Sequence, residues 1–223
     1  MVTSDDIPPL LSPPPPSYGR AGRNLAAATG VAVGLGAVIL VSLFVQKVVF
    51  VGVVVVAITV AIWELSAALA VRGVRVPVVP VVLGGIAMLV SAYVGGTEAL
   101  TVSLALTVLA LLVWRLGETS NGFVRDVTAG SFTALYVPFL AGFAVLLTRP
   151  DDGPWRVVTF LLVVVASATG GYLFGVLFGR HPMAPSVSPK KSWEGFLGSL
   201  VLCAAVAIAA VTLLLDGRWW AGA

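Results

Sequence analysis

The run "VVFVGVVVVAITVAIWELSAALA", residues 48–70, decides the fold of this chain. Glu64 is its only charged residue, and about 20 apolar residues in a helix are enough to span the hydrocarbon core of a bilayer. Because backbone polar groups in lipid must pair within their own segment, the run predicts a transmembrane helix. An ionisable residue inside a span is costly, so Glu64 is either a functional candidate or lies near the interface and pairs with Arg72.

The rest of the chain has the same apolar character. Of its 223 residues, 59% are hydrophobic and 10% are charged, and the mean hydropathy is +1.05. A soluble domain carries about 25% charged residues, so this chain requires lipid around most of its surface. Cys203 is its only cysteine and His181 its only histidine. This excludes an intramolecular disulfide and metal sites built from several cysteines or histidines.

Seven apolar runs predict an all-α, polytopic bundle of about seven transmembrane helices. The runs cover residues 25–45, 48–70, 77–95, 98–114, 127–148, 157–178 and 195–215. They form one transmembrane domain over residues 25–223. Residues 1–24 are rich in proline and serine and predict an extended or disordered tail.

The basic residues predict which side of the membrane each loop faces. With a cytoplasmic N-terminus, nine of the 13 fall in inner segments. These are Arg20, Arg23, Arg72, Arg75, Arg115, Arg125, Arg180, Lys190 and Lys191. The positive-inside rule therefore predicts a multi-pass protein of the cell's inner or plasma membrane, with the tail and a loop at residues 179–194 in the cytoplasm.

The loop before the last span has the sequence "HPMAPSVSPKKSWEGF", residues 181–196. Ser188 and Pro189 are typical of an N-cap and a first helical residue, so we expect a helix to begin there. Its free N–H groups, the two lysines and the hydroxyls of Ser188 and Ser192 predict a phosphate site. A lysine pair can also serve as an anchor to lipid headgroups, but the prolines, hydroxyls and nearby acid favour a ligand site.

Two further patterns flank this loop. Glu194 lies three residues after Lys191, so it could orient that lysine or help to hold a divalent cation bridging phosphates. Gly171, Gly175 and Gly179 recur every four residues on one helix face. Small residues at this spacing predict that a second helix packs closely against that face.

These residues resemble the phosphatidate cytidylyltransferase (CDP-diacylglycerol synthase) family. The resemblance covers "TGGYLFGVLFGRHPMAPSVSPKKSWEGFLGS", residues 169–199. It includes that family's S-P-x-K-[ST]-x-E-G pattern, which here occupies residues 188–195. The resemblance implies a membrane enzyme that makes CDP-diacylglycerol from CTP and phosphatidic acid, releases pyrophosphate and uses Mg²⁺. It also implies a homodimer and no nucleic-acid partner.

The resemblance assigns roles to individual residues of the loop. The expected substrate-binding residues are Ser188, Lys190, Lys191 and Ser192. The expected catalytic residues are Lys191 and Glu194. The metal ligands stay unassigned, because Ala168 stands where the family has an aspartate.

A second departure leaves the activity open. The family's C-terminal signature, with its Gly-His-Gly-Gly and Asp-Arg-x-Asp patterns, does not occur in the sequence. The chain is then either a piece of a family enzyme or a shortened relative with reduced or no activity. A non-catalytic protein that binds phospholipid or nucleotide is the alternative. A transporter is favoured less, because no internal repeat links the interrupted spans.

Overall fold

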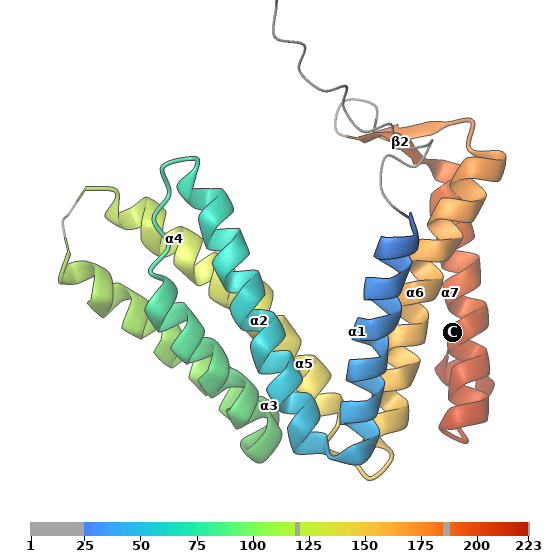
Figure 1. The fold of residues 1–223 in the computed structure, drawn as a ribbon, viewed down its shortest axis with the longest axis horizontal. Coiled ribbons are helices and arrows are strands. Elements are labelled where there is room, and N and C mark those ends of the chain that lie inside the picture. Colours follow the sequence, from blue (N-terminus) through green and yellow to red (C-terminus); the bar gives the residue numbers. More distant parts are fainter. Residues whose placement is uncertain (1–24, 119–120, 185–187, 223) are drawn as a thin grey trace, which may run out of the picture. The chain divides into compact units, whose positions relative to one another are not determined.

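The computed structural model describes residues 25–118, 121–184 and 188–222, apart from the side chains of residues 25–29, 184, 189 and 190. The predicted tail, residues 1–24, lies outside this description. The described part is almost entirely helical (Figure 1). The predicted all-α, polytopic class is therefore confirmed.

Within the described residues, five helical segments are long and apolar enough to cross a membrane. They are α2 (Lys47–Ala70), α3 (Val78–Leu116), α4 with α5 (Phe123–Leu147), α6 (Gly153–Phe178) and α7 (Trp193–Leu214). The preceding α1 (Leu25–Val45) is apolar over Gly30–Val45. Most of α1 belongs to a separate compact unit that ends at Ile39.

The outward surface of these helices is apolar. On α3, the side chains of Val102, Leu106, Leu109 and Val113 recur at helical spacing and are all exposed. A stripe of this kind is unfavourable in water and is ordinary in lipid. The chain is therefore a multi-pass membrane protein.

The helix α3 is broken at Gly96. Its 39 residues would reach about 58 Å as one straight helix, against a hydrocarbon core of about 30 Å. Gly96 has a φ of 79°, in the left-handed region that glycine adopts without strain. This residue therefore permits a sharp change of chain direction inside what the sequence presents as two runs.

The two arms of α3, residues 78–95 and 97–116, run antiparallel beside each other (Figure 1). The Ser103 hydroxyl donates a hydrogen bond to that of Ser91 over 2.8 Å. Further along the arms, a Cβ on Gly84 would overlap the Thr107 side chain. The arms correspond to the predicted runs 77–95 and 98–114.

The segment α4 (Phe123–Ala134), η2 (Leu135–Phe139) and α5 (Leu140–Leu147) is one continuous helical rod with a π-helical turn in its middle. Pro138 lies in that turn and is buried. Proline lacks an N–H and its ring clashes with the carbonyl four residues earlier, so a wider turn accommodates it. The predicted run 127–148 therefore continues across its proline.

Helices α2 to α5 share one apolar core. Ile62 of α2, Met88 and Leu100 of the two α3 arms and Val145 of α5 are fully buried in it. In lipid, close van der Waals packing rather than exclusion of water holds such helices together. Glu64 lies outside the core: it is exposed, and within the described residues it forms no ion pair with Arg72.

Candidate functional site

Helices α6 and α7 cross at nearly direct backbone contact, and this crossing supports the candidate site. A Cβ on Gly195 of α7 would lie 2.9 Å from the carbonyl oxygen of Gly171 and 3.2 Å from the Cα of Gly175. A Cβ on Gly170 would lie 2.9 Å from the carbonyl oxygen of Gly198. The close approach predicted from the glycine spacing is confirmed.

The segment between these helices is a short antiparallel hairpin, β1 (Pro182–Ala184) and β2 (Ser188–Ser192). The expected helix start at Ser188 is wrong, because this residue pairs with Ala184 in the hairpin. Helix α7 begins only after Ser192, whose hydroxyl accepts a hydrogen bond from the Gly195 N–H over 3.2 Å. Ser192, not Ser188, is therefore the N-cap.

Glu194 fastens the end of α6 to the start of α7. Its carboxylate accepts hydrogen bonds from the N–H groups of Arg180 and His181, both over 3.2 Å. The Nδ1 atom of His181 lies 2.5 Å from the same carboxylate, and the Trp193 N–H donates to the His181 carbonyl over 3.0 Å. Glu194 thus contacts His181, and among the described residues it has no bond to Lys191. The expected direct orientation of Lys191 by Glu194 is not found.

A cavity of about 440 Å³ opens between α6, α7 and the hairpin. Lys191 and Ser192 line it from the hairpin, and Gly171 and Ala168 line it from α6. Ser188 lies in β2, partly buried and away from this lining, and the Lys190 side chain is outside the description. The structure therefore brings together two of the four predicted substrate-binding residues, together with the position where the family has an aspartate.

The described residues contain no cluster of three or more histidine, cysteine, aspartate or glutamate side chains suited to a metal ion. Ala168 brings no oxygen ligand to the cavity. Glu194 is already engaged by two N–H groups and by His181. A hard cation such as Mg²⁺ prefers several oxygen ligands, so the protein side chains described here do not by themselves fit one.

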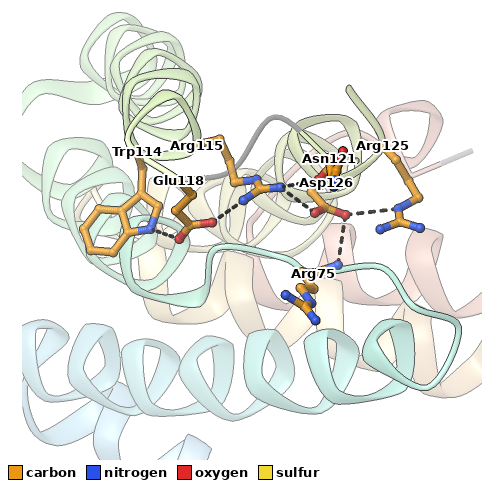
Figure 2. A network of polar contacts seen from close by, with 7 residues as sticks. All are labelled: Arg75, Trp114, Arg115, Glu118, Asn121, Arg125 and Asp126. Carbon is orange, nitrogen blue, oxygen red and sulfur yellow. Dashed lines mark hydrogen bonds and ion pairs between the residues drawn. The ribbon is translucent and has the colours of Figure 1, made fainter. Parts of the chain in front are cut away.

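A second polar cluster joins the loops before α3 and after it (Figure 2). Asp126 of α4 is 1% exposed and accepts hydrogen bonds from Arg115 Nη2 at 2.9 Å, the Arg75 N–H at 3.0 Å and Arg125 Nε at 3.1 Å. Arg115 is 4% exposed and also bonds Glu118 and the carbonyl of Asn121. These residues form an ion-pair network, defined here as the Arg115–Asp126 network.

Sequence reasoning missed this network, since it treated Arg75, Arg115 and Arg125 only as charges on the inner side. The available signal was an aspartate eleven residues after Arg115. An acid and a base at the facing ends of two helices joined by a short turn are placed to pair. Buried charges in proteins are nearly always paired.

Comparison with known proteins agrees with the loop residues. Residues 26–223 match the profile described as the cytidylyltransferase family. The phosphatidate cytidylyltransferase of Mycobacterium leprae is 37% identical over 220 residues, 92% of this chain and 70% of that protein. That of Mycobacterium tuberculosis (strain H37Rv) is 37% identical over 223 residues, 94% of this chain and 68% of that protein.

Another relative matches only a short part of this chain. The phosphatidate cytidylyltransferase of Staphylococcus haemolyticus is 40% identical over 60 residues, 27% of this chain and 23% of that protein. No solved structure matches the chain. The family resemblance inferred from residues 169–199 is confirmed over almost the whole length of the sequence. The chain belongs to the cytidylyltransferase family, with 37% identity to the phosphatidate cytidylyltransferases of mycobacteria.

Proposed function

We propose that this protein transfers a cytidylyl group from CTP to phosphatidic acid, giving CDP-diacylglycerol and pyrophosphate. The observation that carries the proposal is the α6–α7 cavity, which joins Lys191 and Ser192 on one wall in a chain of this family. Its volume of about 440 Å³ is ordinary for a small-ligand site. The non-catalytic alternative has no observation in its favour.

The reaction requires positioning more than covalent help from the protein. An oxygen of the lipid phosphate attacks the α-phosphorus of CTP and forms a new P–O bond. The bond from the α-phosphorus to the bridging oxygen breaks, and pyrophosphate leaves with that electron pair. Phosphoryl-group transfers of this kind depend on alignment of the two oxygens and on neutralisation of charge.

Lys191 supplies the positive charge at the cavity wall. Its ammonium group suits the negative charge of the CTP phosphates, and the Ser192 hydroxyl lies beside it at the start of α7. The helix N-terminus adds a partial positive charge at the same place. Ser188 and Lys190 belong to the same strand and stay predicted substrate-binding residues.

Glu194 acts as a positioning residue in this proposal. By holding the Arg180 and His181 backbone it fixes the base of the hairpin that carries Lys191. The catalytic role implied by the resemblance stays a prediction. On this basis Glu194→Gln lowers turnover more than it weakens binding of CTP, and a comparison of kcat with the CTP dissociation constant tests this. An equal loss in both contradicts the positioning role.

Magnesium stays a proposal as well. The described side chains do not by themselves hold the ion, so Mg²⁺ would have to enter together with CTP, and it would supply neutralisation of phosphate charge. Titration of CTP binding with and without Mg²⁺ tests its need. Affinity that is unchanged without the ion contradicts this expectation for the binding step.

We further infer seven crossings and a cytoplasmic N-terminus. Seven crossings arise when α1, both α3 arms, the α4–α5 rod and the three other helices each span once. Contacts support the alternation: Lys47 Nζ donates to the Pro150 carbonyl at 2.6 Å, and Arg149 Nη2 donates to the Val94 carbonyl at 3.4 Å. These two bonds link the connections before α2, between the α3 arms and before α6, which therefore lie at one end of the helices. The Arg115–Asp126 network links the connections before and after α3 at the opposite end. Reporter fusions at residue 75 and residue 150 test the sides, which must differ.

A homodimer is the remaining inference, and it rests on the family resemblance alone. Mass measurement of the detergent-solubilised protein tests it. A monomeric mass at concentrations where the enzyme is active contradicts the dimer.

The central experiment measures CTP binding and turnover of phosphatidic acid by the purified chain in detergent. Lys191→Ala is expected to abolish detectable CTP binding. Arg180→Ala is the matched control, because it removes a positive charge from the same connection without removing a residue of the cavity lining. Equal CTP affinity in the Lys191→Ala variant and the parent would overturn the assignment of the cavity.

A further inference from the structure

A second cavity, on the α2–α4 side of the chain, has no part in the proposed reaction. It measures about 1090 Å³ and is bordered by residues 70–77, 115–118 and 121–126. Three arginines line it, namely Arg75, Arg115 and Arg125, together with Glu118 and Asp126. Three positive charges against two negative ones leave an excess of one positive charge.

Some of the arginine donor groups at this cavity have no partner among the described residues. The Nε atom of Arg115 is buried and has no hydrogen-bond partner among the described residues. The Arg75 guanidinium makes no hydrogen bond or ion pair within the described residues. The bond from Arg75 to Asp126 comes from the backbone N–H of Arg75. The Arg125 side chain is 54% exposed. Asp126 already accepts three hydrogen bonds, two of them from the arginine side chains of Arg115 and Arg125 (Figure 2). Among the described residues, the Arg75 guanidinium and the exposed part of Arg125 are therefore the cationic groups left for a ligand.

Each of the two turns at the cavity contains a glycine that lies close to the Arg125 guanidinium. Gly73 and Gly122 both have a φ of 74°, a conformation that other residues adopt only with strain. A Cβ on Gly73 would lie 3.9 Å from Arg125 Nη1, and one on Gly122 would lie 2.9 Å from Arg125 Nη2. The Arg125 guanidinium thus lies close to both turns.

An apolar groove begins beside the cavity. It lies between the two arms of α3, has a volume of about 380 Å³ and is lined mostly by apolar residues from Val79 to Ala87 and from Ser103 to Trp114. Trp114 belongs to the groove, while its Nε1 donates at 3.0 Å to Glu118 of the cavity. The eight helical steps from residue 79 to residue 87 carry the groove about 12 Å deeper along the helix axis.

We propose that this cavity and groove form a binding site for an acidic phospholipid, with the phosphate at the arginines and an acyl chain between the α3 arms. The cavity lies at the ends of transmembrane helices, which is the level of lipid phosphates. Guanidinium groups bind phosphate through paired, charge-assisted hydrogen bonds. Basic pockets between helices at a membrane surface bind anionic headgroups, and the adjoining groove is what distinguishes a lipid from free phosphate. The site is separate from the Lys191 cavity, and the inference does not depend on the proposed reaction.

Photolabelling tests this inference without CTP and without turnover. The protein in detergent is irradiated with phosphatidic acid that carries a diazirine in one acyl chain, and labelled peptides are identified by mass spectrometry. Label is expected on α3, within residues 79–114. An excess of unlabelled phosphatidic acid should remove it, and the same concentration of inorganic phosphate should not.

The variants separate a specific site from general attraction to charge. Arg75→Gln with Arg125→Gln is expected to require about thirtyfold more lipid for equal labelling of α3. Arg72→Gln is the matched control, because Arg72 is an exposed arginine of the same turn that does not line the cavity. Arg115 is left intact because it is buried and its loss would disturb folding.

Four results would overturn the inference. The first is α3 labelling that is unaffected in the double variant. The second is an equal loss in Arg72→Gln, and the third is displacement of the lipid by inorganic phosphate. Labelling confined to α6 and α7 would likewise reject this site while leaving the proposed cytidylyl transfer intact, since that transfer is measured separately through Lys191.

Discussion

A pair of adjacent glycines in α6 allows the helix crossing to be tested with a built-in control. Gly170→Ala places a methyl group 2.9 Å from the Gly198 carbonyl oxygen and 3.1 Å from the Cα of Ser199. Both neighbours are backbone atoms, so they cannot swing aside. Gly171→Ala places its methyl group 3.7 Å from the Ser199 Cβ, which is ordinary contact.

The magnitude follows from the difference between the two variants. Both gain the helix preference of alanine over glycine, about 1 kcal/mol, and that gain cancels in the comparison. Overpacking a close contact costs about 1–3 kcal/mol, and only Gly170→Ala carries this cost. For a chain of this size each kcal/mol changes Tm by about 2–4 °C. Gly170→Ala is therefore expected to melt several degrees below Gly171→Ala.

The assay is thermal unfolding of the purified variants in one detergent, followed by circular dichroism. CTP affinity of the folded protein is measured beside it, because separation of α6 from α7 also widens the cavity next to Lys191. A Gly170→Ala variant that melts at or above the Gly171→Ala variant would refute the crossing geometry.

Two further predictions concern the polar contacts. Ser192→Ala removes the N-cap of α7 and should lower the stability by about 1 kcal/mol, whereas Ser188→Ala should leave the Tm unchanged. A melting experiment in which Ser188→Ala lowers the Tm and Ser192→Ala does not would restore Ser188 as the cap. Asp126→Ala removes the buried acid of Arg115 and leaves it only the half-exposed Glu118 as an acidic partner, so it should cost about 3 kcal/mol, the lower end for breaking a buried ion pair. Arg115→Leu combined with Asp126→Leu should cost less than the sum of the two single leucine variants, and simple additivity of the three Tm changes contradicts the pairing.

The helices were predictable because lipid imposes length and composition on each segment separately. The predicted run 25–45 coincides with α1, and the predicted run 157–178 ends with α6 at Phe178. Hydropathy does not show whether two apolar runs are joined through a loop or through a single residue, because this depends on the backbone dihedral angles at the junction. Gly95 and Gly96 both lie where the two predicted runs meet, and nothing in the sequence shows which of them takes the positive φ that turns the chain.

The start of α7 was not predictable from local preference. Ser188 and Ser192 are equally good caps, and Pro189 favours the first of them as a helix start. Pairing of Ser188 with Ala184 across the hairpin decides the matter, and cross-strand pairing is a property of two segments. The Arg115–Asp126 network was missed for a related reason, since its members meet only after the chain has turned between α3 and α4.

The position of Lys191 follows from these non-local contacts. If α7 began at Ser188, Lys191 would lie within its first turn, and its direction would be set by the helix alone. In the hairpin, its place depends on pairing with β1 and on the Glu194 brace to Arg180 and His181. The glycine crossing then brings α6, with Ala168, to the same cavity. The lysine is thus held by three independent contacts around a short connection, which is the preorganisation that recognition of a triphosphate at a membrane surface requires.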